Sequence, residues 1–149
     1  MGDGDEQITE EECWELLASA SVGRIALSIH ALPAIFPVQY YLHGRNLAVC
    51  LGHLQLPERA LNAVVAFAAD AIDPASRSGW SVQVQGQASV PRQPIAGTFC
   101  GWPTAGQIVH VEPGTISGHR VHLCPFIDSL LSGQVTPGLA TKGGAWPGS

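Results

Sequence analysis

The dipeptide Gly52-His53 has the greatest potential for chemistry in this chain. It follows a predicted strand directly and precedes a predicted short helix. Backbone amides at such a strand end, near a helix N-terminus, can hold an anion such as phosphate without a lysine. An ordinary glycine turn beside an exposed histidine is the competing interpretation, and it is the more frequent one among loops of this composition.

The other candidate residues form no known catalytic or metal motif. The chain has no Ser-His-Asp spacing signature, no phosphate-binding glycine loop ending in Lys-Ser or Lys-Thr, and no paired metal-binding histidines. His119 and His122 are three residues apart, which places them on opposite faces of a strand, so we interpret them as solvated polar residues. The four cysteines are widely spaced. This spacing favours buried reduced thiols, and disulfides stay open as an alternative.

The distribution of charge excludes several classes of protein. The chain has 149 residues, a single lysine and a formal net charge of -5. Seven of its twelve acids lie in the first fifteen residues, which leaves five acids against seven bases elsewhere. A body without basic clusters argues against nucleic-acid binding. No apolar run is long enough to span a membrane, and the acidic start is not a secretory signal, so we expect a cytoplasmic protein.

The elements that position these residues begin with a helix. Thr9 and Glu12 form a capping box, in which each side chain can bond to the backbone amide of the other residue. Apolar residues then recur at helical spacing, which predicts a short amphipathic helix over residues 10–20. Helix capping therefore explains most of the N-terminal acidity without any partner.

After this helix the pattern is typical of a β protein. Apolar patterning predicts strands over residues 22–30, 35–42, 47–51, 63–72, 80–90, 107–112 and 115–123. We expect turns at 31–34 and 43–46, a short helix at 57–62, and a bulge or corner at Gly86. Pro37 cannot donate to a ladder, so it should lie at an edge, a bulge or a place where something other than a strand approaches. Together these elements predict a closed or nearly closed antiparallel barrel.

The length of the chain suits a single domain. We place that domain at residues 1–124 and interpret the Gly- and Pro-rich residues 125–149 as a flexible C-terminal tail. Residues 91–106, which precede the last two predicted strands, are predicted to form a loop with little regular structure.

Several short segments occur along the chain in a recognisable order. They are Glu12-Cys13-Trp14-Glu15-Leu16-Leu17 with Val22-Gly23-Arg24-Ile25-Ala26, Pro33 with Ile35-Phe36-Pro37-Val38-Gln39-Tyr40, Gly44, Val64-Val65-Ala66-Phe67, Ile72-Asp73-Pro74 with Gly79-Trp80-Ser81-Val82, and Glu112-Pro113 with Ile116-Ser117-Gly118. This series resembles the pyridoxamine 5′-phosphate oxidase-like family of FMN-binding split barrels. It is most similar to the small single-domain branch that includes nitroimidazole-resistance-type proteins.

The resemblance implies a mainly β fold, namely a six- to seven-stranded antiparallel split β-barrel with a short N-terminal helix and one short inserted helix. It also implies a homodimer that holds FMN at the interface between the two copies. The residues implied in cofactor binding are Pro37, Val38, Gln39, Tyr40, Val49, Leu51, Gly52, His53, Gln55, Arg59, Trp80 and Ser81. The nitroimidazole-type branch carries a histidine near the flavin at the turn that matches Gly52-His53. His53 is therefore the candidate catalytic residue, for substrate contact or proton delivery.

The sequence departs from the family pattern where the flavin phosphate is held. Family members usually carry an arginine in the third strand and a lysine just past the turn, where this chain has Val49 and, approximately, Gln55. Each charge-assisted hydrogen bond contributes about 1.5 to 3 kcal/mol, so their loss should weaken FMN binding by about two to four powers of ten. Arg59 is the nearest cation, and Arg24 or Arg45 could substitute if the fold brings them close.

Three functions are consistent with these observations. The first is a flavin-dependent oxidoreductase that acts on a small molecule. The alternative is a split barrel with weakened or lost FMN binding, which would serve as a binding module for another cofactor (a deazaflavin or haem) or small ligand, or as a dimeric regulatory partner. Oxidation of pyridoxine phosphate itself receives only slight support, from His119-Arg120, because basic residues for a substrate phosphate are missing near the C-terminus.

Overall fold

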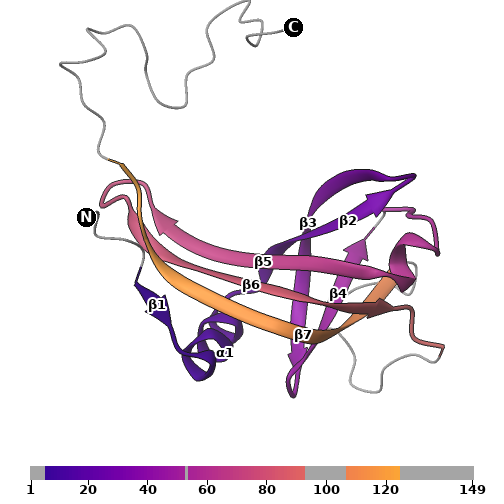
Figure 1. Ribbon diagram of the computed structural model, residues 1–149, viewed down its shortest axis with the longest axis horizontal. Coiled ribbons are helices and arrows are strands. Elements are labelled where there is room, and N and C mark those ends of the chain that lie inside the picture. Colours follow the sequence, from indigo (N-terminus) through magenta and orange to yellow (C-terminus); the bar gives the residue numbers. More distant parts are fainter. Residues whose placement is uncertain (1–5, 53, 93–106, 125–149) are drawn as a thin grey trace, which may run out of the picture.

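The structure is a computed structural model that describes residues 6–52, 54–92 and 107–124 (Figure 1). In chain order its elements are β1 (Gln7–Ile8), α1 (Glu10–Ser19), β2 (Val22–Ile29), β3 (Leu32–His43), β4 (Asn46–Gly52), the 3-10 helix η1 (Ala60–Asn62), β5 (Val64–Asp73), β6 (Ser78–Ser89) and β7 (Gln107–His122). The predicted tail, residues 125–149, and most of the predicted loop lie outside the described residues. Within the described residues, no helix is long and apolar enough to cross a membrane.

The strands form one antiparallel sheet that closes on itself. Its order is β1-β7-β4-β3-β2-β5-β6, and β6 pairs again with β7, which joins six strands into a ring. The split lies along β7, because one edge of this strand pairs with β4 near residues 107–111 and with β1 at residues 118–119. The predicted fold class, an antiparallel split barrel with a short N-terminal helix and one short inserted helix, is confirmed.

The two strands predicted on either side of Gly114 are one continuous strand, β7. Gln85 of β6 pairs with Thr115. The next residue, Gly86, pairs with Pro113, which leaves Gly114 as the extra residue of a β-bulge. The prediction of two strands was therefore wrong, because a bulge absorbs the interruption in the pattern, and the irregularity predicted at Gly86 is confirmed.

The hairpin of β2 and β3 turns at His30 and Ala31 rather than over residues 31–34. Both residues have positive φ, 51° and 67°, as a two-residue type I′ turn requires. Ile29 pairs directly with Leu32, so the residues that follow the turn already belong to β3. The predicted position of this turn was wrong because its two central residues are not the usual glycine or asparagine.

Pro37 lies on an unpaired edge, as predicted. Along residues 32–38, β3 pairs with β2, and its pairing with β4 starts only at Gln39. In an antiparallel ladder, hydrogen-bonded and non-hydrogen-bonded pairs alternate. Counting from the two-residue turn, the nitrogens of Pro33, Ile35 and Pro37 point toward the unpaired edge. The two prolines thus remove no ladder bond, and they leave few donors for an intruding strand.

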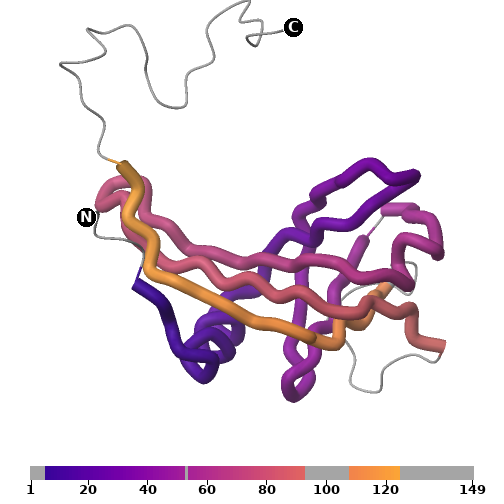
Figure 2. Tube along the Cα trace, viewed as in Figure 1, coloured from indigo at the N-terminus to yellow at the C-terminus, as the bar shows by residue number. Residues whose placement is uncertain are grey.

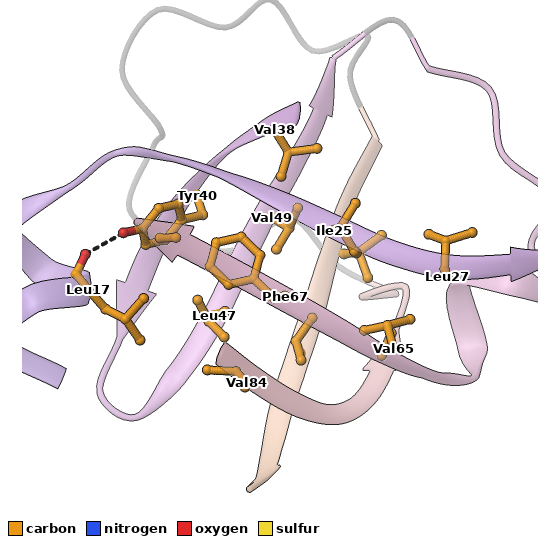
Figure 3. Close-up of a cluster of buried hydrophobic side chains, with 14 of the residues drawn as sticks. Leu17, Ile25, Leu27, Val38, Tyr40, Leu47, Val49, Val65, Phe67 and Val84 are labelled. Atoms are coloured by element: carbon orange, nitrogen blue, oxygen red, sulfur yellow. Dashed lines mark hydrogen bonds between the residues drawn. The ribbon is translucent and has the colours of Figure 1, made fainter. Parts of the chain in front are cut away.

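Apolar side chains fill the interior of the ring (Figure 3). The rings of Tyr40 and Phe67 meet edge to face with their centroids 4.8 Å apart. The Tyr40 hydroxyl donates to the carbonyl oxygen of Leu17 at 2.5 Å, which ties α1 to β3. A Cβ atom at Gly23 would lie 2.3 Å from the Phe67 ring, so only glycine leaves room for this ring. The helix and the barrel therefore share one core.

The predicted cap of α1 is present, although the capping box is only half formed. The Thr9 hydroxyl accepts a hydrogen bond from the Glu12 amide at 3.3 Å. The Glu12 carboxylate does not return to Thr9 and instead pairs with Arg120 of β7. The helix ends at Ser19, one residue before the predicted end. The inserted helix is also present, as the single 3-10 turn η1 rather than a helix over residues 57–62.

Candidate functional site

Strand alternation divides the residues predicted to bind the cofactor into two sets. Four of them point into the barrel and are buried in the core: Val38, Tyr40, Val49 and Leu51. On β3, Pro37 and Gln39 alternate with Val38 and Tyr40 and point outward. Because successive side chains of a strand face opposite sides, the site on β3 consists of the outward pair. The four inward side chains support that pair from behind and are not exposed to a ligand.

Val49 stands where family members usually carry an arginine, and its burial shows whether a cation there could contact a ligand. Its side chain is fully buried in the core, where an unpaired guanidinium would be very costly. A cation at position 49 could therefore not reach a ligand outside this barrel. The departure from the family pattern at this position removes no phosphate contact that the present fold could have offered.

The outward face of β2, β3 and β5 is apolar. We define the outer apolar patch as Ala26, Ile35, Val64, Ala66 and Ala68. Ile35 and Val64 are 65% and 71% exposed, whereas Val22, 55% exposed, is separated from the patch by Arg24 on β2. Ala26 pairs with Ile35 on one side and with Ala66 on the other, so the patch is continuous across the three strands. The sequence did not reveal this surface, because the nearly unbroken apolar run of residues 63–72 does not distinguish the outward from the inward side chains of the strand.

Polar side chains border the patch. Arg24 stands between Pro37 of β3 and Ala68 of β5, and its guanidinium is 3.7 Å from the carboxylate of Asp70. On the far side of β5, the outward residues of β6 are serine and glutamine at alternate positions, from Ser81 to Ser89. The outer surface thus combines an apolar patch with a margin of charged, amide and hydroxyl groups.

Trp80 and Ser81 lie on opposite faces of β6. Ser81 points outward between its cross-strand partners Asp70 and His119. The serine stands in the middle of this row, so Asp70 cannot orient the imidazole of His119 as a catalytic triad requires. Trp80 faces the inner side, where it packs against the core. Of the two predicted residues, Ser81 is the one that shares the outer face with Pro37 and Gln39.

His119 and Arg120 also point to opposite faces of β7. Arg120 makes an ion pair with Glu12 of α1, and its backbone amide donates to the carbonyl oxygen of Glu6 at 2.7 Å. Arg120 therefore fastens the N-terminal segment to the barrel. The slight support that this dipeptide gave to oxidation of pyridoxine phosphate is lost, because its arginine is committed to a structural contact.

The turn after β4 lies at the end of the barrel opposite α1 (Figure 2). Gly52 closes β4 with a φ of 62°, a conformation that favours glycine. His53, the predicted catalytic residue, lies outside the described residues. Gln55 and Arg59 follow on the segment that leads into η1, and both are exposed. The structure therefore keeps Gln55 and Arg59 near the predicted phosphate end, whereas Arg45 lies at the other end of β4.

The buried thiols and the buried phenol are not suited to catalysis. Burial raises the pKa of Cys13 and of Cys50, so neither thiol is activated. Burial also raises the pKa of Tyr40 to about 12. Cys124 is a free, exposed cysteine. Among the described residues, no group of three or more histidine, cysteine or acidic side chains could hold a metal ion.

Comparison with known proteins establishes the family. A sequence model of the family described as pyridoxamine 5'-phosphate oxidase matches residues 9–96. This chain belongs to that family. An uncharacterized protein of Mycobacterium tuberculosis, Rv0080, is 31% identical over 132 residues, which cover 77% of this chain and 84% of the relative. The family resemblance inferred from the sequence is thus confirmed.

Solved structures share the fold. The FAD binding protein from Mycobacterium smegmatis has a TM-score of 0.67 and 29% identity, covering 79% of this chain and 99% of that chain. A conserved protein of unknown function from Corynebacterium diphtheriae has a TM-score of 0.66 and 26% identity, covering 81% of this chain and 100% of that one. A 5-nitroimidazole antibiotic resistance protein from Bacteroides thetaiotaomicron, at 12% identity and a TM-score of 0.58, covers 79% of this chain and 89% of its own and shares the fold alone.

Proposed function

We propose that this chain is a flavin-binding protein of the pyridoxamine 5'-phosphate oxidase family that uses FMN to oxidise or reduce a small molecule in the cytoplasm. The observation that carries the proposal is the outer face, where an apolar patch lies on the same side of the sheet as Pro37, Gln39 and Ser81. The structural neighbour from Mycobacterium smegmatis, described as an FAD binding protein, supports a flavin as the class of ligand.

The outer face has the chemistry that a flavin requires. An isoalloxazine ring needs an apolar surface to lie on and amide or hydroxyl groups along its polar edge. The patch offers the first, and the side chains of Gln39 and Ser81 offer the second. Flavin supplies hydride or single-electron transfer when it is bound. The contribution of the chain is to orient the ring, to exclude water from it and, at His53, to hold a proton for the substrate.

We propose that two copies of the chain assemble through the outer apolar patch and hold the cofactor between them. Ile35 on β3 and Val64 on β5 are exposed, and Ala26 and Ala66 join their strands into one apolar surface of the kind that marks an interface. This apolar face would otherwise remain in contact with water, at a cost that scales with its area.

The assembly is tested by placing a charge in the patch, at its exposed residue Ile35. Ile35→Glu should convert a dimer into a monomer in light scattering at matched concentration, because the carboxylate would be buried without a partner. Thr115→Glu, on the outward surface of β7, is the matched control and should leave the dimer intact. A wild-type chain that is monomeric throughout the concentration range would contradict this part of the proposal.

One observation favours the second candidate, a barrel that binds a cofactor other than FMN. Gln55 stands where family members usually carry a lysine, so the expected cation is missing from the exposed segment after β4. A deazaflavin, a haem or a small ligand that relies less on a phosphate contact would tolerate this change. This candidate predicts that such a ligand raises the melting temperature at lower concentration than FMN does.

The absorbance spectrum of the freshly purified protein, before and after addition of FMN, tests the main proposal. A flavin spectrum, or quenching of FMN fluorescence on titration, is the expected result. A colourless protein that neither quenches micromolar FMN nor is stabilised by it would overturn the proposal. In that case thermal shifts with a deazaflavin and with haem decide whether the second candidate holds.

A further inference from the structure

Two arginines at the Gly52 end of the barrel carry no ion pair. Among the described residues, ion pairs engage Arg24, Arg45 and Arg120. Arg59 and Arg92 are exposed and have no acidic partner in that part of the chain. Exposed guanidinium groups without a partner can bind an anion without first breaking an existing contact.

A side-chain bridge brings the segments of these arginines together. The side-chain oxygen of Asn62, in η1, accepts a hydrogen bond from the amide of Val90 at 3.4 Å. The side-chain nitrogen of Asn62 donates to the carbonyl oxygen of Glu58 at 2.9 Å. Arg59 follows Glu58 directly, and Arg92 lies two residues after Val90. Asn62 thus holds the segment that leads into η1 next to the segment that follows β6, and we call this place the corner.

A backbone bond reinforces this corner. The amide of Ala88 donates to the carbonyl oxygen of Ala63 at 2.9 Å, so the residues that follow η1 are also held against the end of β6. The corner belongs to the end of the barrel at which β4 stops with Gly52 (Figure 1). Arg59 and Arg92 therefore stand near the turn that we expect to hold the phosphate.

We propose that Arg59 and Arg92 form a two-arginine site for the phosphoryl group of the flavin, and that Arg92 takes the place of the cation missing at Gln55. The inference rests on the proposed flavin function. A guanidinium is suited to this task because its donors form a planar fork that matches two phosphate oxygens. The phosphoryl group can come from FMN or from the diphosphate of FAD, and the experiment separates these sources.

The test compares ligands that differ only in phosphate. The affinities of riboflavin, FMN and FAD are measured by fluorescence quenching for the wild type, Arg59→Gln and Arg92→Gln. Each substitution should weaken the binding of the phosphorylated flavin by about 10- to 100-fold, the usual loss for one charge-assisted contact. Riboflavin should bind all three proteins equally. The form that loses more affinity, FMN or FAD, identifies the source of the phosphoryl group.

Arg45→Gln is the matched control, since it removes the same charge at the opposite end of β4 and should not change any of these ratios. If Arg92→Gln binds FMN and FAD as the wild type does, the two-arginine site is overturned while the flavin function stands. If all the proteins bind riboflavin, FMN and FAD equally, the site is likewise overturned.

If no flavin binds, inorganic pyrophosphate tests the two-arginine site independently of the proposed flavin function. Inorganic pyrophosphate should raise the melting temperature of the wild type and not that of the Arg59→Gln/Arg92→Gln double variant. This result without flavin binding would support the anion site and contradict the proposed function. Equal responses of the two proteins would overturn the anion site.

Discussion

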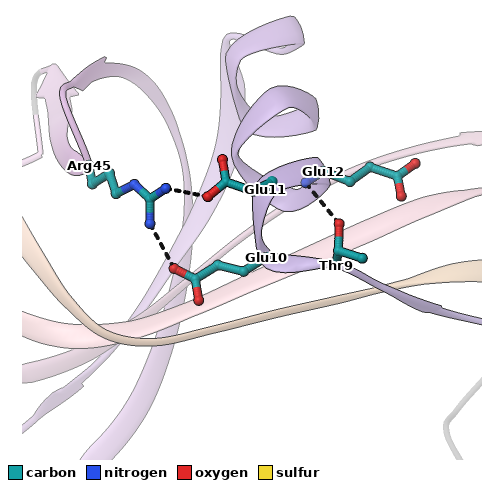
Figure 4. Close-up of polar contacts among 5 residues, drawn as sticks. All are labelled: Thr9, Glu10, Glu11, Glu12 and Arg45. Atoms are coloured by element: carbon teal, nitrogen blue, oxygen red, sulfur yellow. Dashed lines mark hydrogen bonds and ion pairs between the residues drawn. The ribbon is translucent and has the colours of Figure 1, made fainter.

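Two pairs of arginines, near opposite ends of β4, differ in their contacts. At the helix end, Arg45 bonds to Glu10 at 2.9 Å and to Glu11 at 2.5 Å (Figure 4). Its guanidinium also lies 5.9 Å from the centre of the Trp14 ring, within cation–π range. Arg120 pairs with the third glutamate of the same helical turn, Glu12. At the Gly52 end, Arg59 and Arg92 have no acidic partner among the described residues.

This difference separates charges that position the fold from charges that remain available to a ligand. The acidic first turn of α1 contacts two arginines, Arg45 of the β3–β4 turn and Arg120 of β7, which offset two of its three negative charges. The single lysine of the chain, Lys142, lies outside the described residues. In a protein this poor in cations, two arginines left unpaired at one corner are a large share of the positive charge.

The largest loss of stability should come from shortening a buried side chain of α1. Leu17 is fully buried in the core, and Leu17→Ala should lower the free energy of unfolding by about 2 to 5 kcal/mol, because it leaves a cavity between α1 and the barrel. Urea denaturation measures the change. Leu16→Ala, on the partly exposed side of the same turn, should cost clearly less. Equal losses would mean that α1 does not share the core of the barrel.

Removing the Tyr40 hydroxyl tests the buried hydrogen bond between β3 and the carbonyl oxygen of Leu17 in α1. Tyr40→Phe leaves the Leu17 carbonyl without its donor, which should cost about 1 to 3 kcal/mol of unfolding free energy. Denaturant midpoints of the wild type and of Tyr40→Phe report the difference, and a variant as stable as the wild type would show that this bond does not hold α1 to the barrel.

Tyr40 also predicts a pH dependence. Burial raises the pKa of Tyr40 from 10.0 to about 12. Because the folded pKa lies above the unfolded value, the stabilisation is complete below pH 10 and is lost as the pH rises toward 12. The difference corresponds to roughly 2 to 3 kcal/mol. Stability curves of the wild type should fall over this range, and those of Tyr40→Phe should not show this contribution. Parallel curves would contradict it.

The helix cap should have a smaller effect. Thr9→Ala removes the acceptor for the Glu12 amide and should lower the free energy of unfolding by about 1 kcal/mol. Thr115→Ala, which loses an exposed bond to Gln85 at 3.2 Å, is the matched control and should stay within about 0.5 kcal/mol of the wild type. A cap variant as stable as this control would show that the other contacts of the helix end suffice.

The sequence predicted the elements better than the site, for a physical reason. Alternation and capping are local, so the strands, α1 and its cap at Thr9 could be read from neighbouring residues. The same alternation implies that Val38 and Tyr40 face away from Pro37 and Gln39, which the sequence-based site did not take into account. Arg92 could not be found in this way, because its position depends on a hydrogen bond between Asn62 and Val90, which are 28 residues apart.

The smallest changes in stability are expected from replacing Arg45 and Arg92. Arg45→Gln should lower the free energy of unfolding by about 0.2 to 1 kcal/mol at low salt, and by less at high salt, because both of its ion pairs are exposed. Arg92→Gln, which breaks no ion pair with any residue that the structure describes, should stay within about 0.5 kcal/mol of the wild type at both salt concentrations. If Arg92→Gln showed the larger and salt-dependent loss, Arg92 would be a structural contact like Arg45, and the contrast between the two ends of the barrel would disappear.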